Sequence, residues 1–374
     1  MKFEVSSMTL LSHLQQISKV IASKNSLPIL DSFLFDLQGN TLSITASDAE
    51  TRMVTSLEVN NVEGSGVFAV SAKILLDPLK ELADQPLVFT IDDSNLEVFI
   101  YFQNGKYNFI GQRGDTYPEY KTLSEDAASF NIDAQMLLSG INRTFFATAD
   151  DELRPVMNGV YFDLTPDDLT FVASDGHKLV KYRNMALQSG QRAAFILPKK
   201  PANLLKGILA KESSVVEVRF DDKNALFKVP NFEMTCRLIE GRYPNYNSVI
   251  PKENPHKVIV DRIMLLNALK RVSVFSSQSS NLVKFQVVTD QIIISAQDVD
   301  FSTAAEERIS CQYGDVSLSI GFKASYLIEI LNNINATEVV LELADPSRAG
   351  LIVPMVNEAD EELVMLLMPM MLND

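Results

Sequence analysis

One pattern of residues occurs three times along this chain, and it limits the architectures that the chain can adopt. Two strand-like segments joined by a short turn, the second ending in Asp, occupy residues 34–48, 161–175 and 284–298. The three Asp residues, Asp48, Asp175 and Asp298, are 127 and 123 positions apart. A period of this size is that of a whole domain and not of a short solenoid repeat. The sequence therefore predicts three tandem copies of one domain, which favours a curved or ring-like body over an enzyme with a single pocket.

Length and composition agree with this interpretation. A chain of 374 residues is longer than one hydrophobic core usually serves. The composition, 46% hydrophobic and 22% charged, is typical of a soluble globular protein, and no apolar run approaches the roughly 20 residues that span a bilayer. The N-terminus begins directly as an alternating strand, without a signal-peptide pattern. The only cysteines, Cys236 and Cys311, lack metal-ligand spacing and are expected to be free thiols in a reducing compartment.

Helix-period segments show the same threefold repetition. Each copy opens with an apolar segment of this kind, at residues 8–23, 134–149 and 262–277, and a second follows at 71–82, 198–209 and 323–334. Between them the chain alternates with period two and is punctuated by Gly, Asn and Asp turns. We therefore expect an α+β fold in which two helices cover antiparallel sheets in each copy. The predicted domains are residues 1–125, 126–251 and 252–374.

The charges of these helices differ from those of the rest of the chain. The six segments contain 11 Lys and Arg against three Asp and Glu, and the three opening segments contain no acid, although the whole chain has a net charge of −15. A plain solvent-facing surface is one interpretation. The other is a set of helices turned towards a polyanion, whose phosphates they would contact without reading base sequence. The absence of acids from all three copies favours the second.

No catalytic motif emerges from the chain. The three histidines lie in separate segments without metal-binding spacing, and neither a phosphate-cradling Gly-rich loop nor a Gly-x-Ser-x-Gly nucleophile pattern is present. One rival hypothesis is a hydrolase or transferase that uses Asp48, Asp175 and Asp298, but equivalent positions in separate copies favour turn-forming residues at strand ends. A second rival is a peptide-binding scaffold that does not bind DNA.

Several specific segments then resemble a known family. They are Leu27-Pro28-Ile29-Leu30, the run from Ala173 to Leu179, the run from Gly241 to Tyr246, and Met368-Pro369-Met370. In this order, on a threefold repeat, they resemble the bacterial DNA sliding clamps, the beta subunits of the replicative DNA polymerase. The resemblance covers the whole chain. It implies that two chains of three clamp domains each close head to tail into a homodimeric ring around duplex DNA, with helices inside and sheets outside.

The resemblance also implies DNA-contacting and dimer-contacting residues. The DNA-binding set is Lys24, Lys73, Arg143, Arg154, Lys199, Lys200, Lys270 and Arg271. For Arg154 a structural role is the alternative to DNA binding, because the loop of residues 151–156 lacks the paired tyrosines of some family members. Ring closure would bring Tyr107 of the first domain against Val274 and Phe275 of the other chain's third domain, although Phe275 could also be an ordinary core residue.

The resemblance also implies a peptide-binding pocket between the second and third domains. By position it consists of Met157, Ser174, Gly176, His177, Lys178, Leu179, Pro244, Val249, Leu366 and Met368. Apolar walls with a small polar rim suit short motifs with aliphatic and aromatic anchors. Met371 stands where the family often has a basic residue, which changes the pocket rim.

The resemblance implies a function without catalysis or cofactor. The ring would slide on DNA and tether the replicative polymerase and other clamp-binding-motif proteins of replication and repair, thereby raising their effective concentration at the template. An ATP-dependent clamp loader would open the ring, because this chain has no nucleotide motif. The expected location is cytoplasmic, on the nucleoid during replication, with no membrane partner.

Overall fold

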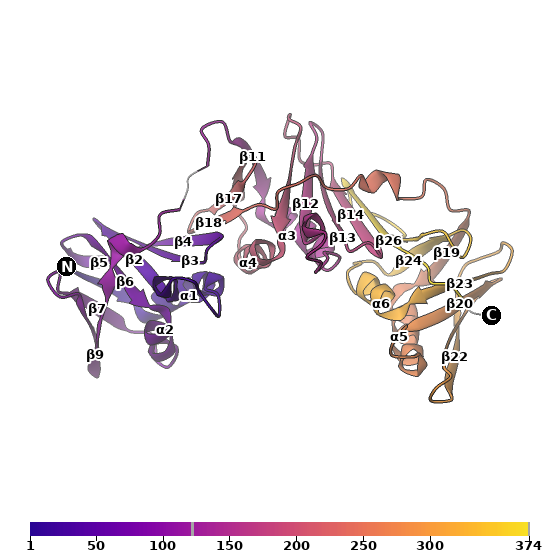
Figure 1. Ribbon diagram of the computed structural model, residues 1–374, viewed down its shortest axis with the longest axis horizontal. Coiled ribbons are helices and arrows are strands. Elements are labelled where there is room, and N and C mark those ends of the chain that lie inside the picture. The colour runs from indigo at the N-terminus through magenta and orange to yellow at the C-terminus, as the bar shows by residue number, and fades with distance from the viewer. Residues whose placement is uncertain (121–122, 373–374) are drawn as a thin grey trace. The chain divides into compact units, whose positions relative to one another are not determined.

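A computed structural model describes residues 1–120 and 123–372 (Figure 1). By their internal contacts these residues form two compact units, Met1–Leu138 with Asn203–Leu238, and Ser139–Ala202 with Ile239–Asp374. Every strand pair found is antiparallel. No helix among the described residues combines the length and the apolar character needed to cross a bilayer.

The described residues of unit 1 contain two sheets and two complete helices. The five-stranded sheet has the order β5 (Asn60–Glu63), β1 (Lys2–Ser6), β7 (Pro86–Ile91), β8 (Glu97–Phe102) and β9 (Gly105–Ile110). The nine-stranded sheet has the order β10 (Gln112–Arg113), β6 (Gly66–Ser71), β2 (Ser32–Gln38), β3 (Thr41–Ser47), β4 (Thr51–Glu58), β18 (Phe232–Arg237), β17 (Asn224–Val229), β16 (Val215–Phe220) and β11 (Ala128–Asp133). Helices α1 (Ser7–Ile17) and α2 (Ala72–Lys80) pack against each other and against β2, β3, β4 and β6.

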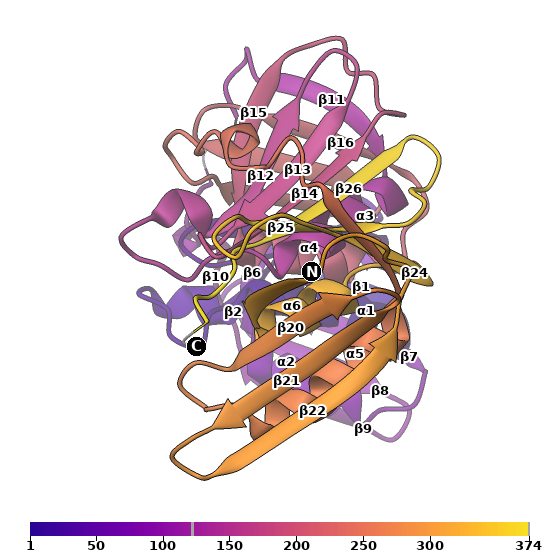
Figure 2. The same ribbon diagram turned by 90° about the vertical axis from the view of Figure 1, so that its right-hand side faces the viewer.

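Unit 2 repeats this organisation. Its eight-stranded sheet has the order β15 (Ala193–Pro198), β12 (Gly159–Leu164), β13 (Leu169–Ser174), β14 (Lys178–Asn184), β26 (Glu361–Leu367), β25 (Gly350–Pro354), β24 (Glu338–Leu343) and β19 (His256–Asp261). Its four-stranded sheet has the order β22 (Thr303–Ser310), β21 (Gln291–Asp298), β20 (Leu282–Val288) and β23 (Leu318–Lys323). Helices α5 (Arg262–Val272) and α6 (Ala324–Asn332) lie side by side behind β20, β21 and β22 in Figure 2. Helices α3 (Ala134–Phe145) and α4 (Lys199–Leu209) each contain a boundary between the units.

The predicted threefold repeat is confirmed in the register of three hairpins. The central aromatic residue of the first strand faces a residue of the second in each copy: Phe35 with Ile44, Phe162 with Phe171, and Phe285 with Ile294. All six side chains are fully buried. The period-two alternation of these segments therefore places equivalent residues in equivalent cores.

Each of the three equivalent turns of the repeat is closed by its Asp residue. One carboxylate oxygen of Asp48 accepts hydrogen bonds from the backbone N–H groups of Glu50 and Thr51, at 2.7 and 2.6 Å. The carboxylate of Asp298 accepts from the N–H groups two and three residues on in the same way, and so does that of Asp175. The prediction that these residues form turns is correct, and the rival hypothesis of a catalytic carboxylate set loses its support.

The opening helices of the three copies also begin alike. The Ser6 hydroxyl accepts a hydrogen bond from the Thr9 N–H at 3.1 Å, and the Asp261 carboxylate accepts one from the Met264 N–H at 2.7 Å. Asp133 caps α3 through the N–H groups of the second and third helical residues. These caps satisfy N–H groups that have no partner inside the helix. The helices end earlier than predicted, because α1 and α5 tighten into the short 3-10 turns η1 (Ser18–Val20) and η6 (Ser273–Phe275).

Two strand ladders join segments that lie far apart in the sequence. Strand β18 pairs with β4, so that Met234 faces Met53. Strand β26 pairs with β14, so that Leu366 faces Leu179. Because these ladders continue the sheets of the middle repeat into those of its neighbours, the two compact units do not coincide with the three predicted domains.

Candidate functional site

The turn between β13 and β14 forms the centre of the candidate site. Asp175 Oδ1 accepts hydrogen bonds from the N–H groups of His177 and Lys178, at 2.8 and 2.9 Å. The Ser174 hydroxyl donates to the Lys178 carbonyl at 2.9 Å and accepts from the Gly176 N–H. Gly176 has a φ of +90°, a conformation that glycine adopts without strain. The turn is therefore rigid, and we call residues 174–178 together with Tyr326, Glu329 and Met368 the turn site.

Lys178 is the buried charge of the turn site. Its side chain is 5% exposed, and its Nζ lies 2.9 Å from Asp175 Oδ2 and 3.0 Å from Glu329 Oε2 of α6. The same ammonium lies over the ring of Tyr326, 4.3 Å from the centroid. Burial by itself lowers the pKa of Lys178, but the hydrogen bonds from Lys178 to the two carboxylates outweigh it and raise that pKa overall. Lys178 was predicted to belong to the peptide-binding pocket, but its side chain lies beneath the surface.

His177 is exposed beside this buried pair. Its ring stacks on the ring of Tyr326 with centroids 5.9 Å apart, and its carbonyl accepts a hydrogen bond from the Met368 N–H at 2.9 Å. Met368 is 43% exposed. The turn thus brings an imidazole, an aromatic ring and a flexible thioether to one surface.

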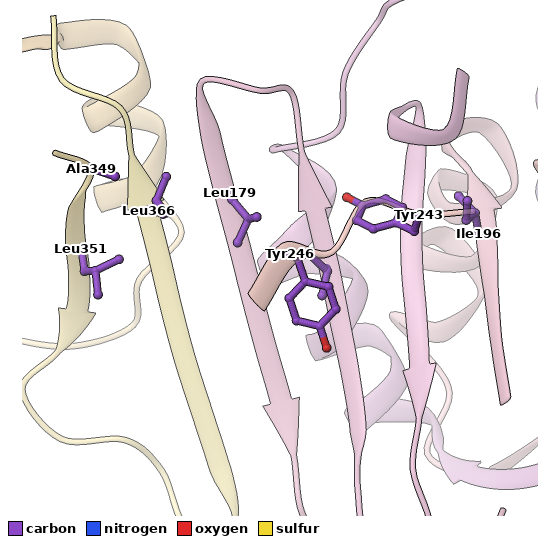
Figure 3. Packing of buried hydrophobic residues seen from close by; sticks show 8 residues of the cluster. Leu179, Ile196, Tyr243, Tyr246, Ala349, Leu351 and Leu366 are labelled. Atoms are coloured by element: carbon purple, nitrogen blue, oxygen red, sulfur yellow. The ribbon is translucent and has the colours of Figure 1, made fainter. Parts of the chain in front are cut away.

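An apolar cluster lies next to the turn site. It is formed by Val172, Leu179, Ile196, Tyr243, Tyr246, Ala349, Leu351 and Leu366. Figure 3 shows Leu179 and Leu366 on neighbouring strands, with the segment that carries Tyr243 and Tyr246 crossing the sheet. The Tyr246 hydroxyl donates to Asp163 at 2.8 Å, and burial raises the pKa of this tyrosine. The cluster gives the site an apolar floor that is held from several strands.

The loop before η4 (Pro155–Met157) is tied to the turn. Arg154 Nε donates to Asp151 Oδ2 at 2.8 Å, and its guanidinium lies 2.9 Å from the position that a Cβ atom on Gly176 would take. The Asp151 carboxylate also accepts from the Leu153 N–H. Arg154 therefore has the structural role that the sequence left open, and its contact with DNA stays a prediction.

The structure brings together most of the residues predicted for the pocket. Ser174, Gly176, His177 and Lys178 form the turn to which Met368 is bonded, and Leu179 and Leu366 lie in the apolar cluster. Met157 is buried in η4, and its N–H bonds to the Arg154 carbonyl at 2.9 Å. Pro244 and Val249 are exposed near η5 (Tyr246–Ser248), Val249 by 56%.

Sequence reasoning missed Tyr326 and Glu329 as members of the turn site. Both lie on one face of α6, three positions apart, and both contact the Lys178 ammonium. The available signal was that Glu329 is the single acid of its predicted helix.

The basic residues predicted to face DNA differ in exposure and in ion pairing. Six are exposed: Lys24, Lys73, Arg154, Lys200, Lys270 and Arg271. Several of the eight also pair with acids of their own unit. Lys199 Nζ lies 2.7 Å from Asp150, and Arg271 makes two hydrogen bonds to Glu307, at 2.8 and 2.7 Å.

Arg143 has a role inside unit 2. Its side chain is 17% exposed, lies 3.3 Å from Glu361 and 3.6 Å from Glu358, and covers the ring of Tyr182 at 5.1 Å. Arg143 is thus engaged with carboxylates of its own unit, and its contact with DNA stays a prediction.

The residues predicted for dimer closure lie at two sheet edges. Tyr107 is on β9, the last strand of its sheet, beside a hollow of about 320 Å³ that Ile74, Pro78, Ile100 and Phe109 also line. In unit 2, η6 contacts the edge strand β22, and there Val274 is 76% and Phe275 40% exposed. Phe275 is thus not an ordinary core residue. An edge strand flanked by exposed apolar side chains is a surface that favours pairing with another chain.

Comparison with known proteins identifies the family. Three family models match in order: the DNA polymerase III beta subunit N-terminal domain over residues 1–121, its central domain over 131–245, and its C-terminal domain over 247–371. The chain belongs to the DNA polymerase III beta subunit family. The predicted resemblance to sliding clamps is therefore confirmed.

Individual family members are similar over nearly their whole length. The beta sliding clamp of Synechococcus elongatus is 30% identical over 340 residues, which are 88% of this chain and 89% of that protein. The one from Pseudomonas putida is 29% identical and covers 98% of this chain and 99% of its own. Among solved structures, sliding clamps of Pseudomonas aeruginosa and Bartonella birtlesii, both bound to griselimycin, match with TM-scores of 0.94 and 0.92, identities of 25% and 27%, and full coverage of both chains. The three-domain α+β clamp fold predicted from the sequence is thus confirmed.

Proposed function

We propose that two copies of this chain close head to tail into a ring that encircles duplex DNA and slides along it. The ring is a processivity factor: it tethers the replicative DNA polymerase to its template. It is not an enzyme. Two observations carry this proposal. Three consecutive beta-subunit domain models match the chain between residues 1 and 371, and its fold matches that of a sliding clamp over the full length of both chains. The ring comprises three clamp domains per chain, at residues 1–125, 126–251 and 252–374.

DNA is held by enclosure and by weak phosphate contacts. Lys24, Lys73, Lys200 and Lys270 supply exposed cations for these contacts, and Lys199, Arg271 and Arg154 add charge where their acidic neighbours leave them accessible. Contacts to phosphate carry no sequence information, so the ring moves without preference along the duplex.

Ring closure joins β9 of one chain to β22 of the other. Both are edge strands, and each has apolar side chains beside it that are exposed in the single chain. Tyr107 and the hollow next to it receive Val274 and Phe275 of the second chain. Two such heterologous contacts complete a closed circle.

Partner proteins bind at the turn site and its apolar floor. A short peptide with aliphatic and aromatic anchors buries those anchors against Leu179, Leu366 and Met368, and His177 supplies a polar contact. A flexible Met-containing surface of this kind accommodates related but different peptides. The occupants include the polymerase, an ATP-dependent clamp loader and other replication and repair proteins. We propose griselimycin, to which two similar sliding clamps are bound, as a probe of the same site. The protein works in the cytoplasm, on the nucleoid.

Retention on DNA of two topologies tests the proposal. The labelled protein is loaded onto nicked circular DNA with a clamp loader, and half of the sample is then linearised with a restriction enzyme. Enclosure predicts that protein stays on the circles and leaves the linear DNA over its ends. A Phe275→Asp variant is the control, since it is expected not to close. Equal loss from circles and from linear DNA would refute the ring.

A further inference from the structure

The two walls of the turn site come from segments that the chain separates by about 150 positions. One wall is the Ser174–Lys178 turn, and the other is the face of α6 that carries Tyr326 and Glu329. Three non-covalent links join them: the Lys178–Glu329 ion pair at 3.0 Å, the Lys178 ammonium over Tyr326 at 4.3 Å, and the His177–Tyr326 stack. Lys178 takes part in two of the three.

The burial of Lys178 indicates what kind of role it has. At 5% exposure its ammonium is nearly inaccessible to a bound peptide, whereas the neighbouring His177 is exposed. Its two carboxylate partners belong to different walls, Asp175 to the turn and Glu329 to the helix. Both carboxylates lie within 3.0 Å of the same nitrogen, so they would repel each other once that cation is removed. An apolar replacement would therefore separate the walls as well as release them.

We propose that Lys178 is a positioning residue that clasps the turn to α6 and thereby presets the surface that partner peptides bind. This inference rests on the proposed function, because it assigns the turn site to partner binding. The clasp fixes the His177 ring against Tyr326, and it keeps the turn where the His177 carbonyl accepts the Met368 N–H. A site that is already ordered does not lose binding free energy to the ordering of its own side chains.

Lys181 provides a matched control within the same strand. It lies three residues along β14, its side chain is 18% exposed, and its Nζ pairs with Glu362 of β26 at 3.5 Å. Lys181→Met thus removes a partly buried lysine and an ion pair of unit 2 without touching the turn. The comparison separates the loss of the clasp from a general loss of stability.

The test measures griselimycin binding by titration calorimetry with the full-length protein, together with the melting temperature of each variant. In Lys178→Met the ligand must order two side chains, those of His177 and Tyr326. The affinity of this variant for griselimycin is therefore expected to fall about tenfold. Lys178→Arg keeps the cation and is expected to restore binding to within about threefold of wild type. Lys181→Met is expected to bind like wild type even where its melting temperature falls.

The outcomes distinguish the clasp from the site itself. If the wild-type protein does not bind griselimycin, the assignment of the turn site fails. If the wild type binds and Lys178→Met binds equally well, the clasp is refuted. Should Lys178→Met fail to fold, Glu329→Gln replaces it, because Glu329 is 48% exposed and its loss leaves Lys178 paired with Asp175. A weakening in Glu329→Gln, about threefold and absent in Lys181→Met, supports the clasp, and unchanged affinity refutes it.

Discussion

Gly140 of α3 lies against the ring of Phe171, so a methyl group added at this position has no room. An ideal Cβ would lie 2.4 Å from two ring carbons of Phe171 and 2.6 Å from a third, whereas carbon atoms attract at about 3.5–4.0 Å. The ring is fully buried and packs against Phe162 and Tyr182, with centroids 4.7 and 6.0 Å away. The ring therefore cannot move aside without disturbing its neighbours.

The expected cost of Gly140→Ala follows from two opposing terms. Overpacking a buried site costs about 1–3 kcal/mol, and the three short contacts place this case near the upper end. Replacing Gly by Ala inside a helix returns about 1 kcal/mol. The net loss of about 1–2 kcal/mol lowers the melting temperature by about 3–6 °C for a unit of this size.

A second helical glycine gives the opposite expectation for the same substitution. A Cβ on Gly207 of α4 would meet only the ends of two flexible side chains, Lys19 Nζ at 3.3 Å and Gln16 Oε1 at 3.7 Å. Gly207→Ala should therefore raise the melting temperature by about 1–3 °C, since the helix gain of up to about 1 kcal/mol is not opposed.

Thermal unfolding followed by circular dichroism measures both variants. In a Phe171→Leu background the cost of Gly140→Ala should shrink, because the smaller side chain leaves space, and a double-mutant cycle reports that coupling. The reasoning is refuted if Gly140→Ala is as stable as wild type, or if its cost is the same with Leu at position 171.

Three further predictions concern the proposed surfaces. Phe275→Asp should convert the dimer into a monomer in light scattering with little change in melting temperature, because Phe275 is already 40% exposed in the single chain; a persistent dimer contradicts the proposed closure. Lys73→Glu should reduce the slope of log affinity for duplex DNA against log salt concentration by about one or more, and an unchanged slope removes Lys73 from the interface. Burial by itself raises the pKa of Asp175, but hydrogen bonds from Lys178 and His177 lower it overall, so this carboxylate stabilises the fold above its unfolded pKa of about 3.9 and stops doing so as pH falls through its folded pKa. The difference in melting temperature between wild type and Asp175→Asn should accordingly be largest near pH 7 and shrink below about pH 4, and a difference independent of pH contradicts this.

Local sequence patterns predicted the parts of the fold that depend on local structure. The hairpins, the Asp turns and the starts of the helices each follow from alternation, a turn residue or a cap within a few positions. The ladders of β18 with β4 and of β26 with β14 could not be predicted from such patterns, because any strand edge offers the same N–H and C=O groups. Their register depends on which distant strand is available.

The charges show the same limit at the candidate site. Counting basic residues on helices identified Arg143 and Arg271, but not the carboxylates that face them from distant strands. These carboxylates are 218 and 36 positions away, and a helix-by-helix count assigns them to the acidic remainder of the chain. The net charge of a segment therefore overstates the cation that it offers to a ligand.

The covalent fusion of three repeats changes how often the proposed ring can break. Where one repeat meets the next, the β4–β18 and β14–β26 ladders lie within a single polypeptide, so both ends of each ladder stay tethered after it separates and re-form without a diffusional search. A ring of six repeats assembled from separate chains would contain six reversible joints, whereas a ring of two fused chains contains two. Each joint left to diffusion is a place where DNA can escape, and fusion therefore lengthens the lifetime of the closed state without strengthening any single interface.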